Sequence, residues 1–91
     1  MKILENEIQE KIKIFERQNV IVQFSNILEA KFEMHNIHID YNRKSGFLNI
    51  VEASTNNEIK LNIASAYRID LTDNILKIDL DNSLDFKIMI K

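Results

Sequence analysis

Residues 20–41 read VIVQFSNILEAKFEMHNIHIDY, and the spacing of their apolar residues decides the expected fold. From residue 28 to Met34, apolar residues occupy every even position and charged or polar residues every odd one, which is typical of a half-buried β-strand. The same segment has strong helix propensity, and we favour a strand because the alternation has no exception. A turn at Ser25-Asn26 would pair this strand with residues 20–25.

The apolar phase reverses after Met34. Ile37, Ile39 and Tyr41 stand at odd positions, so they face the opposite side of a strand that continued in register. The chain must therefore insert a bulge, bend or turn at His35-Asn36. Such a bend either curls a small sheet into a barrel or carries the chain from one layer to another.

Upstream, residues 2–18 are predicted to form an amphipathic helix. Its apolar stripe follows the 3.6-residue repeat and consists of Leu4, Ile8, Ile12 and Phe15, with Ile3 and Ile14 beside it. Asn19 can adopt the left-handed conformation that ends a helix. The stripe is expected to cover the apolar face of the sheet.

Downstream, short apolar runs alternate with turn residues every eight to ten positions, which is typical of an antiparallel meander. Residues 47–53 are apolar on both faces and indicate a central strand. The other strands are expected at 59–63, 67–71, 76–80 and 84–90. We therefore expect an α+β protein with an N-terminal amphipathic helix packed on a six- to seven-stranded antiparallel meander, a bent sheet or partial barrel. Residues 1–91 would form a single domain, with the helix in 1–18 and the sheet in 19–91.

Charge patterning predicts the registers of the C-terminal hairpins. Opposite charges stand side by side if the pairs are Ile63 with Tyr67, Leu71 with Leu76, and Leu80 with Phe86. Pairing Leu80 with Leu84 would instead oppose like charges on two rungs. Because each opposed pair is worth roughly 0.2–1 kcal/mol, we expect the Leu80–Phe86 register.

Composition excludes several chemistries. The 91 residues include 12 basic and 14 acidic side chains, a net charge of -2, one Gly, no Pro and no Cys. Disulfides, thiolate nucleophiles and cysteine-ligated metals are thereby excluded, as are glycine-rich phosphate loops. No block of like charge appears, so we do not expect a basic arm for nucleic acid.

The expected setting is the cytoplasm. No apolar run reaches the ~20 residues that span a bilayer, and Glu5, Glu7 and Glu10 stand where a signal peptide would be uncharged. We therefore expect a small intracellular protein without a membrane partner. Abundant Ile, Asn and Lys at the expense of Gly, Pro and Ala indicate an AT-rich genome, of a low-GC bacterium or its phage.

Two short motifs have the residue types of metal sites: His35, His38 and Asp40, and the series Asp79, Asp81, Ser83 and Asp85. The first is interpreted as surface residues of a bent strand. The second is interpreted as a hairpin turn, because Leu84 and Ile90 stand where a calcium loop needs Gly and Glu. The serines lie in expected turns without the glycines of a nucleophile elbow, and no sequence feature buries a carboxylate. We expect no catalytic, cofactor-binding or metal-binding residues, and no enzyme.

The leading functional expectation is a protein-interaction module that binds another protein or itself. A small open sheet leaves edge strands that can pair with another chain, and Pro, a common edge blocker, is absent. A phage- or mobile-element-encoded inhibitor or accessory factor fits the size and composition.

The alternative is a small barrel that binds RNA or single-stranded nucleic acid. A helix followed by VIVQFSN, residues 20–26, resembles the first strand and turn of Sm-like RNA-binding proteins. Those proteins place glycines in the bent second strand and in a late RNA-contacting loop, whereas this chain has only Gly46. Lys31, Arg43, Lys44 and Lys60 would form a modest basic patch, with Tyr41 and Tyr67 as candidates for base stacking.

Overall fold

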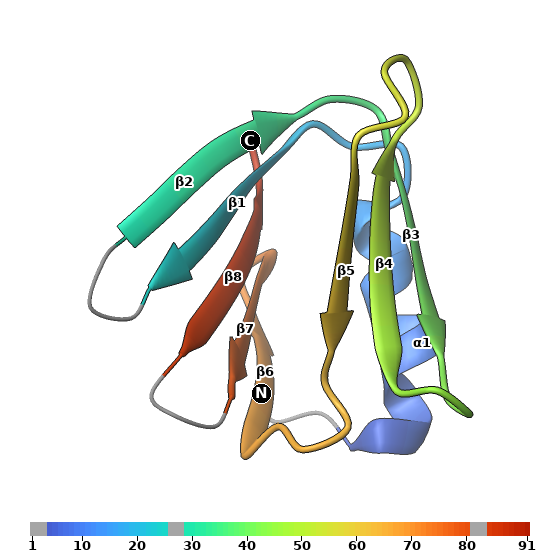
Figure 1. Ribbon diagram of the computed structural model, residues 1–91, viewed down its shortest axis with the longest axis vertical. Helices are drawn as coiled ribbons and strands as arrows, with labels where there is room; N and C mark the ends of the chain where they lie inside the picture. Colours follow the sequence, from blue (N-terminus) through green and yellow to red (C-terminus); the bar gives the residue numbers. More distant parts are fainter. Residues whose placement is uncertain (1–3, 26–28, 81–83) are drawn as a thin grey trace.

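The computed structural model, which describes residues 4–25, 29–80 and 84–91, is an α+β fold of one helical segment and two antiparallel sheets (Figure 1). The described strands are β1 (Val20–Ser25), β2 (Glu29–Met34), β3 (Ile37–Asn42), β4 (Phe47–Glu52), β5 (Glu58–Asn62), β6 (Arg68–Thr72), β7 (Ile75–Asp79) and β8 (Asp85–Ile90). They form a five-stranded sheet in the order β2-β1-β8-β7-β6 and a three-stranded sheet in the order β3-β4-β5. The α+β class with antiparallel strands is confirmed, but the expectation of six to seven strands in one meander is wrong, and the described strands do not close into a barrel.

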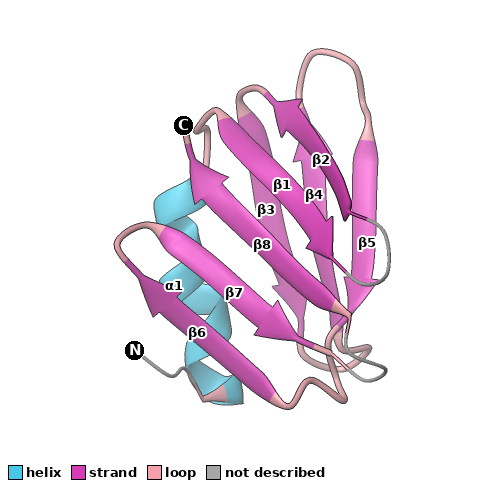
Figure 2. Cartoon of the chain, turned by 90° about the vertical axis from the view of Figure 1, so that its left-hand side faces the viewer, coloured by secondary structure: helices cyan, strands magenta, loops and turns pink. Residues whose placement is uncertain are grey.

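The two sheets enclose the core, with the helical segment beside β3 (Figures 1 and 2). The core draws side chains from the helical segment, from both sheets and from two residues outside the strands. Its buried apolar residues are Ile8, Ile12, Phe15, Val20, Val22, Met34, Ile37, Ile39, Tyr41, Leu48, Ile50, Ile63, Leu76, Ile78, Leu80, Phe86 and Ile88. A change of layer at His35-Asn36 was one of the two expected outcomes of the bend, but the division of the strands between two sheets was not predicted. A period of two marks the buried face of a strand without saying which sheet the strand joins.

The helical segment is shorter than predicted. It consists of a 3₁₀ turn (Glu5–Glu7), the α-helix α1 (Ile8–Lys11) and a second 3₁₀ stretch (Ile12–Phe15). Its buried side chains follow the predicted stripe, except that Leu4 is exposed. The left-handed residue that follows the segment is Arg17, with φ 61°, rather than Asn19. The early end lets the Arg17 amide donate to the Ile37 carbonyl at 2.7 Å, so that the chain turns along β3.

The predicted bend at His35-Asn36 is confirmed. β2 lies in the five-stranded sheet and β3 in the three-stranded one, and Asn36 between them has φ 49°. Asn tolerates this left-handed conformation better than most residues. The odd positions of β3 are buried as predicted, but in β2 only Met34 is buried, because β2 is an outer strand that covers the core with one end.

The expected Ile63–Tyr67 hairpin is wrong. β5 and β6 belong to different sheets, so residues 63–67 are a second crossover and Lys60 does not face Asp70. Ser25, expected in a turn, is the last residue of β1.

Of the two other registers, one is confirmed and one is wrong. Leu71 pairs with Leu76 across a turn whose residues Asp73 and Asn74 have φ 51° and 66°. Such two-residue turns match the strand twist.

In the last hairpin the Leu80 amide donates to the Leu84 carbonyl at 2.8 Å. Lys77 therefore faces Lys87, and Asp79 faces Asp85. In this register Met89 of β8 stands between two apolar neighbours, Ile75 of β7 and Ile21 of β1. The predicted register would replace Ile75 with Lys77. Apolar contact and the shorter connection thus outweigh the repulsion of two like-charge rungs.

Candidate protein-interaction edge

Each open sheet has two outer strands, and an outer strand carries main-chain N–H and C=O groups that no neighbouring strand satisfies. Here these strands are β2 and β6 in the larger sheet and β3 and β5 in the smaller one. The partners of these groups show which edges are available to another chain.

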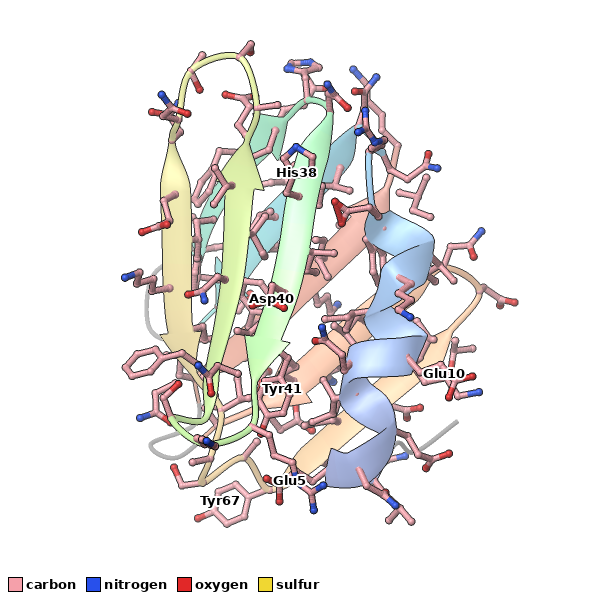
Figure 3. All side chains as sticks on the ribbon, turned by 90° about the vertical axis from the view of Figure 1, so that its right-hand side faces the viewer. Glu5, Glu10, His38, Asp40, Tyr41 and Tyr67 are labelled. Atoms are coloured by element: carbon pink, nitrogen blue, oxygen red, sulfur yellow. The ribbon has the colours of Figure 1, made fainter. Side chains whose placement is uncertain are left out.

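The β3 edge is closed by the helical segment (Figure 3). The Tyr41 amide donates to Gln9 Oε1 at 2.8 Å, and the Ile39 amide donates to Glu16 Oε2 at 3.2 Å. With the Ile37 carbonyl already bonded to the end of the segment, this edge has no room for another strand.

The β6 edge borders a pocket of about 200 Å³ near the start of the helical segment, lined in part by Leu4, Ile8, Ile63, Tyr67 and Arg68. Tyr67 is largely exposed, whereas Tyr41 is buried and its hydroxyl donates to Glu5 at 3.3 Å. Burial, followed by the nearby Glu5 carboxylate, raises the pKa of the Tyr41 phenol. Of the two tyrosines considered for base stacking, only Tyr67 is accessible.

The β2 edge is open along its middle. The Lys91 amide donates to the Asn19 carbonyl and extends the β1–β8 ladder, so the odd residues of β1 bond toward β8. Bonding direction alternates along an antiparallel strand, so the even residues of β1 bond toward β2. In the β1–β2 register these even residues meet Ala30, Phe32 and Met34. The main-chain groups of Lys31 and Glu33 therefore point away from the sheet.

A buried carboxylate closes this edge at His35. The His35 amide donates to Glu52 Oε2 at 2.7 Å, and the Thr55 hydroxyl donates to Glu52 Oε1 at 2.6 Å. The Thr55 hydroxyl and then the His35 amide lower the pKa of Glu52, whose residue is only 7% exposed. No sequence feature indicated a buried carboxylate, and the structure shows that Glu52 is one.

Phe32 is the exposed aromatic residue of this edge. It is 41% exposed, and its ring centroid lies 6.1 Å from that of Phe24, which packs in turn on Phe86. Beside it, a groove of about 370 Å³ separates β2 from β5 and is lined by Phe32, Glu33, Met34, Asn57, Glu58 and Ile59. An aromatic side chain that packs on a neighbouring ring and is still partly exposed is a typical anchor for a protein partner.

The outer face of β2 carries charges of alternating sign: Glu29, Lys31 and Glu33. The Glu33 carboxylate pairs with Lys91, and this hydrogen bond is the main cause of the lowered pKa of Glu33. Within the described part of the chain, Lys31 has no ion-pair partner. The alternation of apolar residues predicts Phe32 to be buried, so this edge could not be recognised from the sequence. The clean alternation of charge with apolar residues does not show which strand is outermost.

The three residues of the first motif considered for metal binding, His35, His38 and Asp40, have protein partners. His38 and Asp40 lie on β3, next to the helical segment (Figure 3). His38 Nδ1 lies 2.6 Å from Glu16 Oε1, and Asp40 accepts from Gln9 Nε2 at 3.0 Å. His35 lies instead at the crossover, with Nδ1 3.4 Å from Glu52. Among residues 4–25, 29–80 and 84–91, no three His, Asp or Glu side chains form a metal-binding group. Asp81 and Ser83 of the second motif lie outside the described residues.

Comparison of the chain with protein-family models, curated proteins and solved structures found no match. In the ranges that the structure describes, no helix has the length and apolar character needed to cross a membrane.

Proposed function

We propose that this chain is a small intracellular protein-interaction module that binds an extended segment of another protein, or of a second copy, along the β2 edge. The outward main-chain groups of Lys31 and Glu33, beside the exposed Phe32, carry this proposal. An added strand would gain main-chain hydrogen bonds from the edge and specificity from the groove. A phage- or mobile-element-encoded inhibitor or accessory factor suits the size and composition.

Charge favours a protein over nucleic acid as the partner. β2 carries two carboxylates and one ammonium group on its outer face, and the whole chain has a net charge of -2. Phosphate recognition needs a surface dominated by Lys and Arg. The accessible Tyr67 is followed by Arg68, whose guanidinium pairs with Asp70 at 3.0 Å. Nucleic acid binding therefore remains the second candidate.

Affinity capture from host lysate with three baits tests the proposed edge. Lys31→Pro removes the outward N–H, which an edge position tolerates, whereas Lys31→Ala removes the same side chain and keeps that N–H. We expect the wild type and Lys31→Ala to capture the same protein and Lys31→Pro to lose it. Equal capture by folded Lys31→Pro would contradict the proposal.

Titration with random-sequence single-stranded RNA and DNA tests the second candidate. Specific or general phosphate binding falls steeply as salt rises. We expect no binding at low salt. Salt-dependent binding that survives Lys31→Pro would favour the nucleic acid function instead.

A further inference from the structure

We propose that β2 pairs antiparallel with β2 of a second copy, about a two-fold axis through Phe32, so that the two five-stranded sheets become one continuous sheet. This inference rests on the proposed function and names its partner. In Figure 2, β2 is the last strand on its side of the five-stranded sheet.

The charges of β2 are self-complementary in this register. An axis through Phe32 places Lys31 of each copy opposite Glu33 of the other, and Glu29 opposite His35. Opposed charges of unlike sign stabilise a strand pair, and like charges destabilise it. An axis through Lys31 would oppose two lysines, and one through Glu33 would oppose two glutamates.

The direction of the main chain agrees with the same register. Lys31 and Glu33 both point their N–H and C=O groups outward, so they can exchange hydrogen bonds as a pair on each side of the axis. The His35 amide is already held by Glu52, which limits the shared ladder to these two residues. A contact this short is expected to give a weak dimer, at the small end of specific interfaces.

The apolar face is also complementary. Phe32 would meet Phe32 of the second copy at a position without main-chain hydrogen bonds, where opposed Cα atoms are about 4.5 Å apart and side chains touch. Both rings would lie over the groove beside Met34 and Ile59. The small Ala30 would face the larger Met34. The pairing thus covers the exposed aromatic residue of this edge.

Charge did not decide the β7–β8 register, but it can decide the register between two copies, because the two strand pairs are constrained differently. Within one chain, a short connection and apolar rows restrict how two strands can slide. No connection joins the β2 strands of two copies, so charge, Phe32 contact and bonding direction are the terms that select the register.

Sedimentation equilibrium of charge-reversed variants tests the pairing. Lys31→Glu and Glu33→Lys alone each oppose like charges in a homodimer, and we expect each to raise the dimer dissociation constant at least tenfold. An equimolar mixture of the two restores both opposite-charge pairs and should form a heterodimer. Lys13→Glu, an equal charge change on the helical segment, should leave the dissociation constant unchanged. Unchanged dimerisation of the single variants would overturn the proposal.

Cysteine cross-linking tests the register itself, because the chain has no native Cys. Under mild oxidation, Phe32→Cys should form a disulfide-linked dimer, since residues on the axis lie within disulfide range. Lys31→Cys and Glu33→Cys should not. Preferential cross-linking at either of those positions would overturn the Phe32-centred register.

The two proposals fail in different ways. A wild type that stays monomeric at millimolar concentration, while lysate capture still depends on the Lys31 amide, overturns self-pairing and leaves the β2 edge as a site for another protein. A monomer whose capture does not depend on that amide overturns both.

Discussion

At the residue scale, Glu52 shows what the sequence does not reveal. It continues the buried face of β4 after Leu48 and Ile50, and a carboxylate there needs fixed donors. The donors include the Thr55 hydroxyl and the His35 amide, which come from a turn and from the crossover. Neither neighbour could be identified without the fold, whereas the bend at His35-Asn36 could be, because the phase reversal is local.

We expect Glu52 to make the protein less stable as the pH falls into the acid range. Its pKa is lowered from 4.5 in the folded chain, so ionised Glu52 contributes stability above that pH, and the contribution is lost as pH falls through the folded pKa. Glu52→Gln should unfold at lower urea than the wild type at pH 7 and lose less stability on acidification. Glu58→Gln, at an exposed β5 position, is the matched control. Parallel pH profiles of Glu52→Gln and the wild type would contradict this role.

At the element scale, the helical segment closes the β3 edge and completes the core. Ile12 is 1% exposed, whereas Ile14, two residues on, is 39% exposed. Ile12→Asp should cost on the order of 4 kcal/mol or more, because it buries an unpaired charge. Ile14→Asp should change stability little. Urea denaturation measures both, and similar midpoints for the two variants would mean that the segment does not pack as described.

The strands could be located from the sequence, but only some of their pairing partners could be predicted. The β1–β2 and β6–β7 pairings are local and were predicted, since only a few residues of sequence separate the two strands of each pair. The contact of β1 with β8 joins distant segments, and alternation carries no information about it. The β7–β8 register was missed because charge pairs, worth roughly 0.2–1 kcal/mol each, were weighed without the apolar row on the outer face.

The like-charge rungs of β7 and β8 give a further test. Lys87 faces Lys77 on one side and Gln23 on the other. Lys87→Glu should therefore raise the free energy of unfolding by roughly 0.2–1 kcal/mol, because it converts a repulsive pair into an attractive one. Lys13→Glu is again the control. A thermal midpoint that falls for Lys87→Glu relative to this control would argue against the observed register.

At the scale of the whole molecule, the fold distributes its edges unequally. One edge is covered by the helical segment, and another presents Lys31 and Glu33 beside an exposed Phe32. Natural sheets usually protect such an edge with charged side chains, especially Lys, or with Pro, a bulge or inward-pointing charges. Here the charges of β2 point outward and alternate in sign, which permits pairing rather than preventing it.

Amide hydrogen exchange along β2 tests the central claim most directly. In dilute solution, the Lys31 and Glu33 amides should exchange rapidly, while those of Ala30 and Phe32, which bond to β1, should exchange slowly. At concentrations where sedimentation shows the dimer, the Lys31 and Glu33 amides should become protected and the other two should change little. Protection of Lys31 and Glu33 in the dilute monomer, or equally rapid exchange in the dimer, would contradict a binding site formed by the β2 main chain.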